Sequence, residues 1–375
     1  MRSVQTFVSM YFILGTAIAN AQPSFQTIGT LQTSTNTVSY AFGVSQDGTY
    51  VVGDSNSIGG TDAIRWSAAG GLESIPRLPN TSNYYAFDVS SDGSYVLGQY
   101  GQHGFVWSES FGTVAVGDLP GGTVRSVMTS IGDDGTAVGT SSFGFAPNGS
   151  PLNRAIRWTP SGGIEALPLP GANDLLSNSQ ANVALPDGRI FGRSASGAWL
   201  YDERNGTFEM LPDADGMIRA NPDGTFFGGQ DSLGGGARAA YWTRDEGLTF
   251  LPVMDGHVFS NFRGMSDDGS VITGISIGQS DAQRVVWLNR GAPIRVIDYA
   301  TSLGLDMEGW VISDVFDVSA DGSTIVGSAR HVSWESGHLE GFVLTIPAPA
   351  SAGVLAAFGL GAMRRRRCGA QQPAL

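Results

Sequence analysis

The chain contains residue types that bind metals or take part in hydrolysis, but they are scattered. Its four histidines lie in separate segments and lack the tight spacing of a metal-binding motif: His103, His257, His331 and His338. The single cysteine, Cys368, excludes a disulfide framework. Acidic loops such as 213–216 leave open a weak Ca²⁺ site. We therefore expect neither a metal centre nor a cofactor.

The arginines and the serine-containing turns invite a comparison with glycan hydrolysis. Turns of the form Ser-x-Asp-Gly-Ser/Thr are similar to the Asp-box of sialidases, in which catalysis would require an arginine triad and a tyrosine nucleophile. Arg65 and Arg157 recur at the same place in strand c, so we expect them to be packing elements rather than members of a convergent triad. Nucleophile-elbow, phosphate-loop and dinucleotide motifs are absent from any strand-to-helix context. We predict no catalytic residues and keep a glycoside hydrolase or polysaccharide lyase as the alternative.

An Asp-Gly pair followed by a short apolar run and a further glycine recurs seven times. The copies begin at Asp47, Asp92, Asp134, Asp187, Asp223, Asp268 and Asp321, at spacings of 45, 42, 53, 36, 45 and 53 residues. Asp-Gly between two strand-like runs is a hairpin signal, because glycine accepts the positive φ of the turn. A period of about 46 residues is typical of one propeller blade. The repeat predicts an all-β, seven-bladed β-propeller with four strands, a to d, in each blade.

A large apolar residue recurs once per repeat near the end of strand c. These residues are Trp66, Trp107, Trp158, Tyr201, Trp242, Trp287 and Leu344. A side chain in register once per blade is expected to pack between adjacent sheets, and a ligand-stacking role is the alternative. The seventh repeat stops after strand c. Residues 25–31 read like the d-strand segment 72–78, so we expect an N-terminal strand to complete the last blade and close the ring.

The composition favours a soluble exported protein. The formal net charge is −13, and it becomes more negative if both ends of the chain are removed. Such a surface repels phosphate backbones, so we expect no nucleic-acid partner. Residues 1–21 combine a basic start, an apolar stretch and the small residues Ala19 and Ala21, as in a secretory signal peptide, and a membrane anchor is the alternative. This leaves a propeller domain at 22–346 and a tail at 347–375.

The tail has three parts: Pro347 and Pro349, an apolar segment at 350–363, and a basic cluster of Arg364, Arg365, Arg366 and Arg367. As a helix the apolar segment would extend roughly 21 Å, short of the bilayer core, so we expect only transient membrane contact. The tail resembles the PEP-CTERM sorting signal of Gram-negative bacteria, although Ala348 replaces the glutamate of the name motif. The resemblance implies export machinery and an exosortase-like processing enzyme as partners. A simple C-terminal anchor is the alternative.

The repeats resemble those of HAF-type extracellular proteins. Residues 41–53 read Ala-Phe-x-Val-Ser-x-Asp-Gly and then Val-Val-Gly, residues 63–66 end in Arg-Trp, and residues 72–79 match the Leu-x-x-Leu-Pro ending. Residues 303–310 look like the last-repeat signature of the family. The resemblance covers nearly all of residues 24–344. It implies an exported propeller in the extracellular matrix or at the cell surface, with no established catalytic residues.

Any ligand site is expected on one face of the ring. The a–b and c–d turns are short and share a face, whereas the b–c and d–a connections on the other face vary in length, with long b–c loops at 140–154 and 328–340. Binding usually lies in variable loops on a rigid scaffold. Aromatic residues expected there could stack on sugar rings or cap the blade cores: Tyr84, Tyr85, Phe143, Phe145, Phe259, Trp310 and Trp334. The sequence thus predicts a non-catalytic binding or structural module for an exopolysaccharide or a surface protein.

Overall fold

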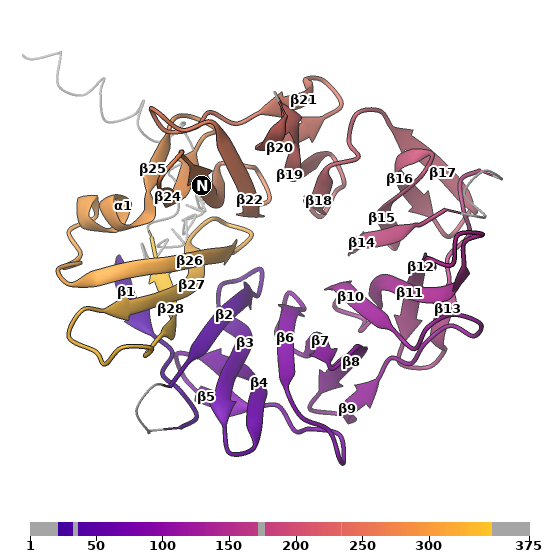
Figure 1. The fold of residues 1–375 in the computed structure, drawn as a ribbon, viewed down its shortest axis with the longest axis horizontal. Helices are drawn as coiled ribbons and strands as arrows, with labels where there is room; N and C mark the ends of the chain where they lie inside the picture. Colours follow the sequence, from indigo (N-terminus) through magenta and orange to yellow (C-terminus); the bar gives the residue numbers. More distant parts are fainter. Residues whose placement is uncertain (1–21, 33–36, 172–176, 234, 347–375) are drawn as a thin grey trace, which may run out of the picture.

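The computed structural model describes residues 22–32, 37–171, 177–233 and 235–346. Seven four-stranded antiparallel sheets are arranged around a central axis, which confirms the seven-bladed propeller (Figure 1). The predicted signal peptide and sorting tail lie outside the described residues. α1 (Val296–Ser302) is the one α-helix in the described ranges, and nothing there is a candidate membrane-spanning helix.

In blades 1 to 6 the chain runs from the innermost strand a to the outermost strand d, and in blade 7 the N-terminal strand takes the outermost place. Blade 1 contains β2 (Ser39–Val44), β3 (Tyr50–Ser57), β4 (Gly60–Ser67) and β5 (Gly71–Ser74). Blade 2 contains β6 (Tyr84–Val89), β7 (Tyr95–Tyr100), β8 (His103–Ser108) and β9 (Gly112–Ala115). Blade 3 contains β10 (Ser126–Ile131), β11 (Ala137–Phe145), β12 (Pro151–Thr159) and β13 (Gly163–Ala166). Blade 4 contains β14 (Gln180–Ala184), β15 (Arg189–Ser194), β16 (Gly197–Asp202) and β17 (Thr207–Leu211).

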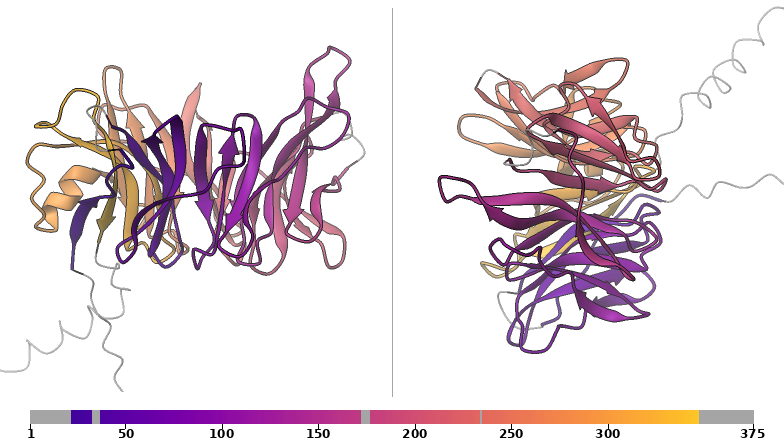
Figure 2. Two further views of the ribbon diagram at one scale, coloured as in Figure 1. Left: turned by 90° about the horizontal axis from the view of Figure 1, so that it is seen from below. Right: turned by 90° about the vertical axis from the view of Figure 1, so that its right-hand side faces the viewer.

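The remaining blades complete the ring. Blade 5 contains β18 (Met217–Ala220), β19 (Phe226–Leu233), β20 (Gly236–Thr243) and β21 (Gly247–Phe250). Blade 6 contains β22 (Phe259–Met265), β23 (Val271–Ile277), β24 (Ala282–Leu288) and β25 (Pro293–Arg295). Blade 7 contains β26 (Trp310–Val318), β27 (Thr324–His331), β28 (Glu340–Thr345) and β1 (Ser24–Thr27). Figure 2 shows the ring edge-on, with the strands running between its two faces.

The N-terminal strand closes the ring as predicted, although it is shorter than the expected segment. β1 pairs antiparallel with β28, from Ser24 opposite Thr345 to Thr27 opposite Phe342. Phe25 packs against Trp310 and Phe342, with ring centroids 4.9 and 5.3 Å apart. First and last strands therefore share one sheet, and no blade is left incomplete at the seam.

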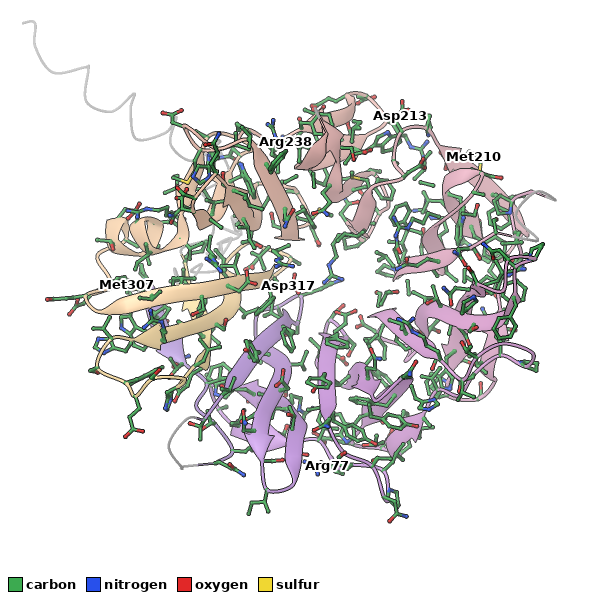
Figure 3. All side chains as sticks on the ribbon, in the orientation of Figure 1. Arg77, Met210, Asp213, Arg238, Met307 and Asp317 are labelled. Atoms are coloured by element: carbon green, nitrogen blue, oxygen red, sulfur yellow. The ribbon has the colours of Figure 1, made fainter. Side chains whose placement is uncertain are left out.

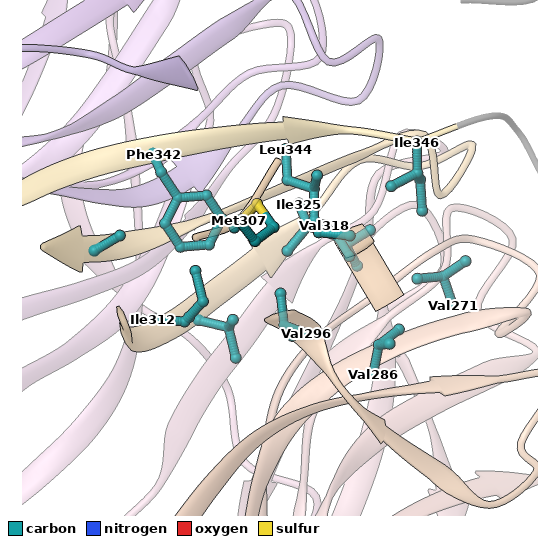
Figure 4. Packing of buried hydrophobic residues seen from close by; sticks show 13 residues of the cluster. Val271, Val286, Val296, Met307, Ile312, Val318, Ile325, Phe342, Leu344 and Ile346 are labelled. Carbon is teal, nitrogen blue, oxygen red and sulfur yellow. The ribbon is translucent and has the colours of Figure 1, made fainter. Parts of the chain in front are cut away.

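The recurring large residues of strand c pack between blades, as expected. All seven are buried. Trp66 of blade 1, for example, lies in one hydrophobic cluster with Val326 and Val343 of blade 7. Figure 4 shows the neighbouring junction, where Val271 and Val286 of blade 6 meet side chains of blade 7. The inter-blade cores account for the spacing of these residues along the chain.

Arg65 links blade 1 to blade 2, which confirms its expected packing role. Its guanidinium pairs with Glu73 of its own blade and with Glu109 of blade 2, and it donates to the carbonyl of Gly93 at 3.0 Å. The guanidinium also lies 4.7 Å from the ring centroid of Trp107. Arg157 of blade 3 pairs with Glu165 and with Glu203 of blade 4 in the same manner. These arginines therefore join neighbouring blades.

Replacing Arg65 with alanine should destabilise the propeller by about 1–3 kcal/mol, because the change removes a buried guanidinium that bonds the Gly93 carbonyl, packs on Trp107 and pairs with two exposed glutamates. Thermal unfolding followed by circular dichroism measures the loss. Arg204→Ala is the matched control, since Arg204 is exposed and, among the residues that the structure describes, its ion pair is with Asp202 of its own hairpin, and it should cost less than about 0.5 kcal/mol. Equal losses for the two variants would contradict the role of Arg65 as an inter-blade link.

Candidate functional site

The innermost strands each contain a β-bulge at the same place. The a–b pairing shifts register by one residue in every blade, after Ala41, Ala86, Met128, Ala181, Met217, Phe262 and Val315. A bulge adds one unpaired residue to its strand and redirects that side chain. The extra residues are Phe42, Phe87, Thr129, Asn182, Ile218, Arg263 and Phe316. Each blade thus has one unpaired residue on its innermost strand, the strand next to the central channel.

This bulge explains the glycine on strand b that follows the apolar run after each Asp-Gly pair. It lies on strand b opposite the residue that precedes the bulge, as Gly98 lies opposite Ala86. A Cβ on Gly98 would lie 2.0 Å from the carbonyl oxygen of Tyr85. The same backbone approach, between 1.8 and 2.5 Å, occurs at the equivalent glycines Gly53, Gly139, Gly192, Gly229, Gly274 and Gly327. No side chain fits at these positions.

Five aromatic side chains form an arc on the inner strands of blades 7, 1 and 2. We call Tyr40, Phe42, Tyr85, Phe87 and Phe316 the aromatic arc. Phe42 contacts Phe316 and Phe87, with centroids 4.9 and 5.8 Å apart. Tyr40 stacks on Phe42, and Tyr85 stacks on Phe87, at interplanar angles of 5° and 3°. All five side chains are half-buried, so part of the arc is open to solvent.

A cavity of about 130 Å³ lies in the channel next to the aromatic arc, and residues of all seven blades line it. Its walls include Asp88, Ser130, Val183, Arg219 and Asp317, each located four residues before an Asp-Gly pair. Figure 3 labels Asp317 close to the axis of the ring. The cavity lies where the innermost strands end, near the face of the ring that has the short a–b and c–d turns. We call this face the Asp-Gly face. The opposite face is the variable-loop face.

Asp88 and Asp317 are held in the cavity wall by the next blade. The backbone N–H of Ile131 donates to Asp88 Oδ2 at 3.0 Å, and that of Val44 donates to Asp317 Oδ2 at 3.3 Å. Enclosure in the channel and the charge of Asp317 raise the pKa of Asp88 to about 6, although Arg219 acts in the opposite direction. Enclosure also raises the pKa of Asp317. Perturbed carboxylates of this kind are frequent at functional sites.

Asp267 adds a third carboxylate at the rim of the cavity. Enclosure raises its pKa to about 6, and the charges of Asp268, Asp223 and Asp321 act in the same direction. Arg219 lies within electrostatic range of Asp88 and Asp317, but in the described part of the chain it forms no ion pair with either. The residues that line the cavity therefore include three carboxylates and one guanidinium.

Asp54 is a buried acid behind the aromatic arc, on strand β3 opposite Tyr40. Its side chain is 4% exposed, and Oδ1 has no hydrogen-bond partner among the described residues. Burial raises the pKa of Asp54 to about 7. Burial, together with the charges of Asp54 and Asp314, also raises the pKa of Tyr40. Asp54 is therefore positioned to change charge near neutral pH.

The sequence-predicted aromatic residues lie at the ends of strands or in loops near the variable-loop face, but they do not form one site. Trp310 and Trp334 contact each other, with centroids 5.3 Å apart. Tyr85 belongs to the aromatic arc. Tyr84 is completely buried, and its ring packs against Tyr100 and Phe105, so it has no face open to a ligand.

The other predicted aromatic residues are separate from this pair and from the arc. Phe145 and Phe259 are 54% and 36% exposed. The ring of Phe143 lies 4.3 Å from the guanidinium carbon of Arg154. The expected long loop at 140–154 is wrong, because β11 and β12 continue their pairing as far as Phe145 and Pro151. Phe143 and Phe145 therefore project from a strand.

Sequence reasoning did not identify Asp88, Arg219 and Asp317. The signal that could have found them is the position four residues before each Asp-Gly pair, which reads Gly, Asp, Ser, Val, Arg, Gly and Asp in blades 1 to 7. Charged residues at a position that is otherwise small or apolar indicate that it faces something other than the blade core.

The histidines occupy separate contacts at or near the variable-loop face. His103 pairs with Asp118, His257 with Asp281, and His338 with Glu340, whereas His331 bonds Ser333. Across the described ranges, no group of three or more histidine, cysteine, aspartate or glutamate residues is arranged to hold a metal ion. In the acidic loop at 213–216, the carboxylate of Asp215 accepts the backbone N–H of Ala198 at 2.7 Å.

Comparisons with solved structures agree on the fold. The chain is similar to an oligogalacturonate lyase from Vibrio parahaemolyticus, with 12% identity, 87% of this chain and 98% of that chain covered, and a TM-score of 0.55. It is also similar to an oligogalacturonate lyase in complex with manganese, at 13% identity, with 87% and 97% covered and a TM-score of 0.54. No protein family matches the sequence, and no curated protein matches it.

A third similar structure is a prolyl endopeptidase, with 11% identity and a TM-score of 0.53. The alignment covers 88% of this chain but 50% of the endopeptidase, so the chain corresponds to about half of that protein. At such identities the likeness shows the propeller fold alone, because one fold supports many unrelated functions.

Proposed function

We propose that this protein is an exported, surface-sorted β-propeller of the HAF type that binds a glycan in its central channel. The observation that carries the proposal is the aromatic arc, in which five half-buried rings from three neighbouring blades line the channel next to a polar cavity. Aromatic planes suit the C–H faces of sugar rings, and the carboxylates and the guanidinium beside them suit hydroxyl groups. Phe145 of blade 3 and Phe259 of blade 6, which are partly exposed and lie apart from each other, are two further places for the same contact.

The ends of the propeller support a defined orientation for a surface-sorted protein. β28 ends and β1 begins at the Asp-Gly face, where Ser24 pairs with Thr345. A signal peptide ending at residue 21 and a tail beginning at residue 347 would both leave the ring there. Under the proposal, the Asp-Gly face is turned toward the membrane during sorting and the variable-loop face is turned away.

Substitution of Phe42 and Phe87 with leucine tests the channel. The change preserves apolar volume but removes two stacking planes, so affinity for the best ligand of a glycan array should fall at least about tenfold, which corresponds to 1.4 kcal/mol. Binding is measured by calorimetry, and circular dichroism checks the fold. Phe111→Leu, at an exposed c–d turn on the Asp-Gly face, is the matched control and should bind like the wild type.

Unchanged binding by the double variant would contradict the channel site. Loss of binding in a Phe145→Leu, Phe259→Leu variant alone would instead assign the ligand to the variable loops. A product assay on each bound glycan separates binding from turnover, and turnover would support the hydrolase or lyase alternative.

A further inference from the structure

The channel cavity has an excess of negative charge. With all groups ionised, the carboxylates of Asp88, Asp267 and Asp317 outnumber the single guanidinium of Arg219. The formal charge of the whole chain, −13, adds to the negative field in the channel. An acidic sugar would be repelled there, whereas a ligand with a positive charge would be attracted. The sign of the field therefore discriminates between classes of glycan.

Asp88 and Asp317 form no ion pair with any of the described residues. Asp88 and Asp317 each accept a backbone N–H from the next blade, and no side chain within the described ranges donates to either one. Arg219 acts on both only through space. Arg219 makes no direct contact with these carboxylates, so a cation that enters and bonds them stabilises them further, because it compensates for their lost hydration.

The aromatic arc supplies a second kind of cation contact next to the cavity. Phe87 and Phe316 directly precede the cavity-lining residues Asp88 and Asp317 in the chain, and Phe42 lies two residues before the lining residue Val44. The arc already holds one cation, since the guanidinium carbon of Arg263 lies 5.9 Å from the centroid of Phe316. Ring faces attract cations, and the attraction is stronger where water is excluded.

We propose that the cavity and the aromatic arc together bind a protonated amino group carried on a sugar ring, so that the glycan is an amine-bearing polymer such as one of glucosamine units. This inference rests on the proposed glycan-binding function. The ammonium group donates hydrogen bonds to Asp88 and Asp317, and the C–H face of its ring stacks on the arc. Arg219 opposes this binding, because it is a like charge in the same cavity.

The test uses the purified full chain and calorimetry near neutral pH, with tetramers of glucosamine, of N-acetylglucosamine and of galacturonic acid as probes. The wild type should bind the glucosamine tetramer at least about tenfold more tightly than the acetylated tetramer. The Asp88→Asn, Asp317→Asn variant should lose this preference. Asp245→Asn removes one charge at an exposed turn outside the cavity and should leave the preference unchanged.

Arg219→Gln keeps the experiment decisive if the double variant fails to fold. This change should raise the affinity for the glucosamine tetramer several-fold, and a gain in affinity cannot result from misfolding. A loss of affinity in Arg219→Gln, or an equal preference of the wild type for the acetylated tetramer, would overturn the inference. Tightest binding of the galacturonic acid tetramer, lost in Arg219→Gln, would also overturn it and assign Arg219 to a carboxylate ligand.

The outcomes also separate this inference from the proposed function. Binding of neutral glycans that depends on Phe42 and Phe87, without preference for amines, would overturn the amine site and leave glycan binding in place. The absence of binding to every glycan on the array would overturn both.

Discussion

Gly98→Ala should destabilise the propeller by about 3 kcal/mol or more, a large effect for the addition of one methyl group. The new Cβ would lie 2.0 Å from the carbonyl oxygen of Tyr85 and 2.6 Å from the ring of Phe105. The oxygen belongs to the bulged inner strand, which cannot withdraw without breaking its pairing with β7. Calorimetric unfolding at several denaturant concentrations measures the loss.

Gly144→Ala is the matched control for this prediction. Gly144 also lies in a second strand of its blade, β11, but a Cβ there would meet no atom within 4 Å. The control should change the free energy of unfolding by less than about 0.5 kcal/mol. Similar losses for Gly98→Ala and Gly144→Ala would show that the close approach at the bulge is not what requires glycine.

Asp54→Asn should flatten the pH dependence of stability between about pH 4 and pH 7. The pKa of Asp54 is raised from its ordinary value of 3.8 to about 7 by burial. Below 3.8 the carboxyl is protonated in both states. As pH rises toward 7, the unfolded chain releases a proton that the folded protein retains, so the wild type loses stability at up to about 1.4 kcal/mol per pH unit. Above 7 the loss is complete.

Between pH 4 and pH 7 the wild type should lose at most roughly 4 kcal/mol of stability through Asp54. Asp54→Asn has no titrating group at this position and should not show this loss. At pH 8 Asp54→Asn should therefore unfold at a higher temperature than the wild type, and near pH 4 the two should be similar. Asp88 and Asp267 titrate in an overlapping range, so the measurement is the difference between the variant and wild-type curves. If the stability of the variant and that of the wild type changed in parallel from pH 4 to pH 8, the raised pKa of Asp54 would be contradicted.

Asp92→Asn should change the pH dependence of stability in the opposite direction to Asp54→Asn. Hydrogen bonds from Ser94 and Ser90 lower the pKa of Asp92. Its contribution to stability is therefore present above the ordinary pKa and is lost as pH falls through the lowered one. The Asp92 variant should differ from the wild type at neutral pH and converge with it under acid conditions, which is the reverse of the Asp54 behaviour.

Much of the fold could be predicted because each blade is a local unit. The Asp-Gly turns, the glycine after strand b and the large residue of strand c recur within one period, and hairpin pairing joins residues that are close in sequence. Residues 25–31 resemble a d strand, and this resemblance predicted the long-range pairing of the first strand with the last one that closes the ring. The structure confirmed it, with β1 beside β28.

The candidate site could be predicted only in part. Tyr85 was among the expected aromatic residues, but Tyr40, Phe42, Phe87 and Phe316 were not. A bulge redirects the side chain of one residue in a strand, and the simple alternation of inward and outward residues does not reveal where this happens. Tyr84 was expected either to stack on a sugar or to cap a blade core, and it packs in the blade core beside Tyr100.

The sequence by itself determined the number of blades, the hairpins within them and the strand that closes the ring, because these depend on short-range periodicity and turn chemistry. Only the tertiary structure decided what lines the channel. Asp88, Arg219 and Asp317 come from blades 2, 5 and 7, and they share one cavity because the ring closes. The residue repeated in every blade specifies the scaffold, whereas the position that differs from blade to blade specifies the chemistry at its centre.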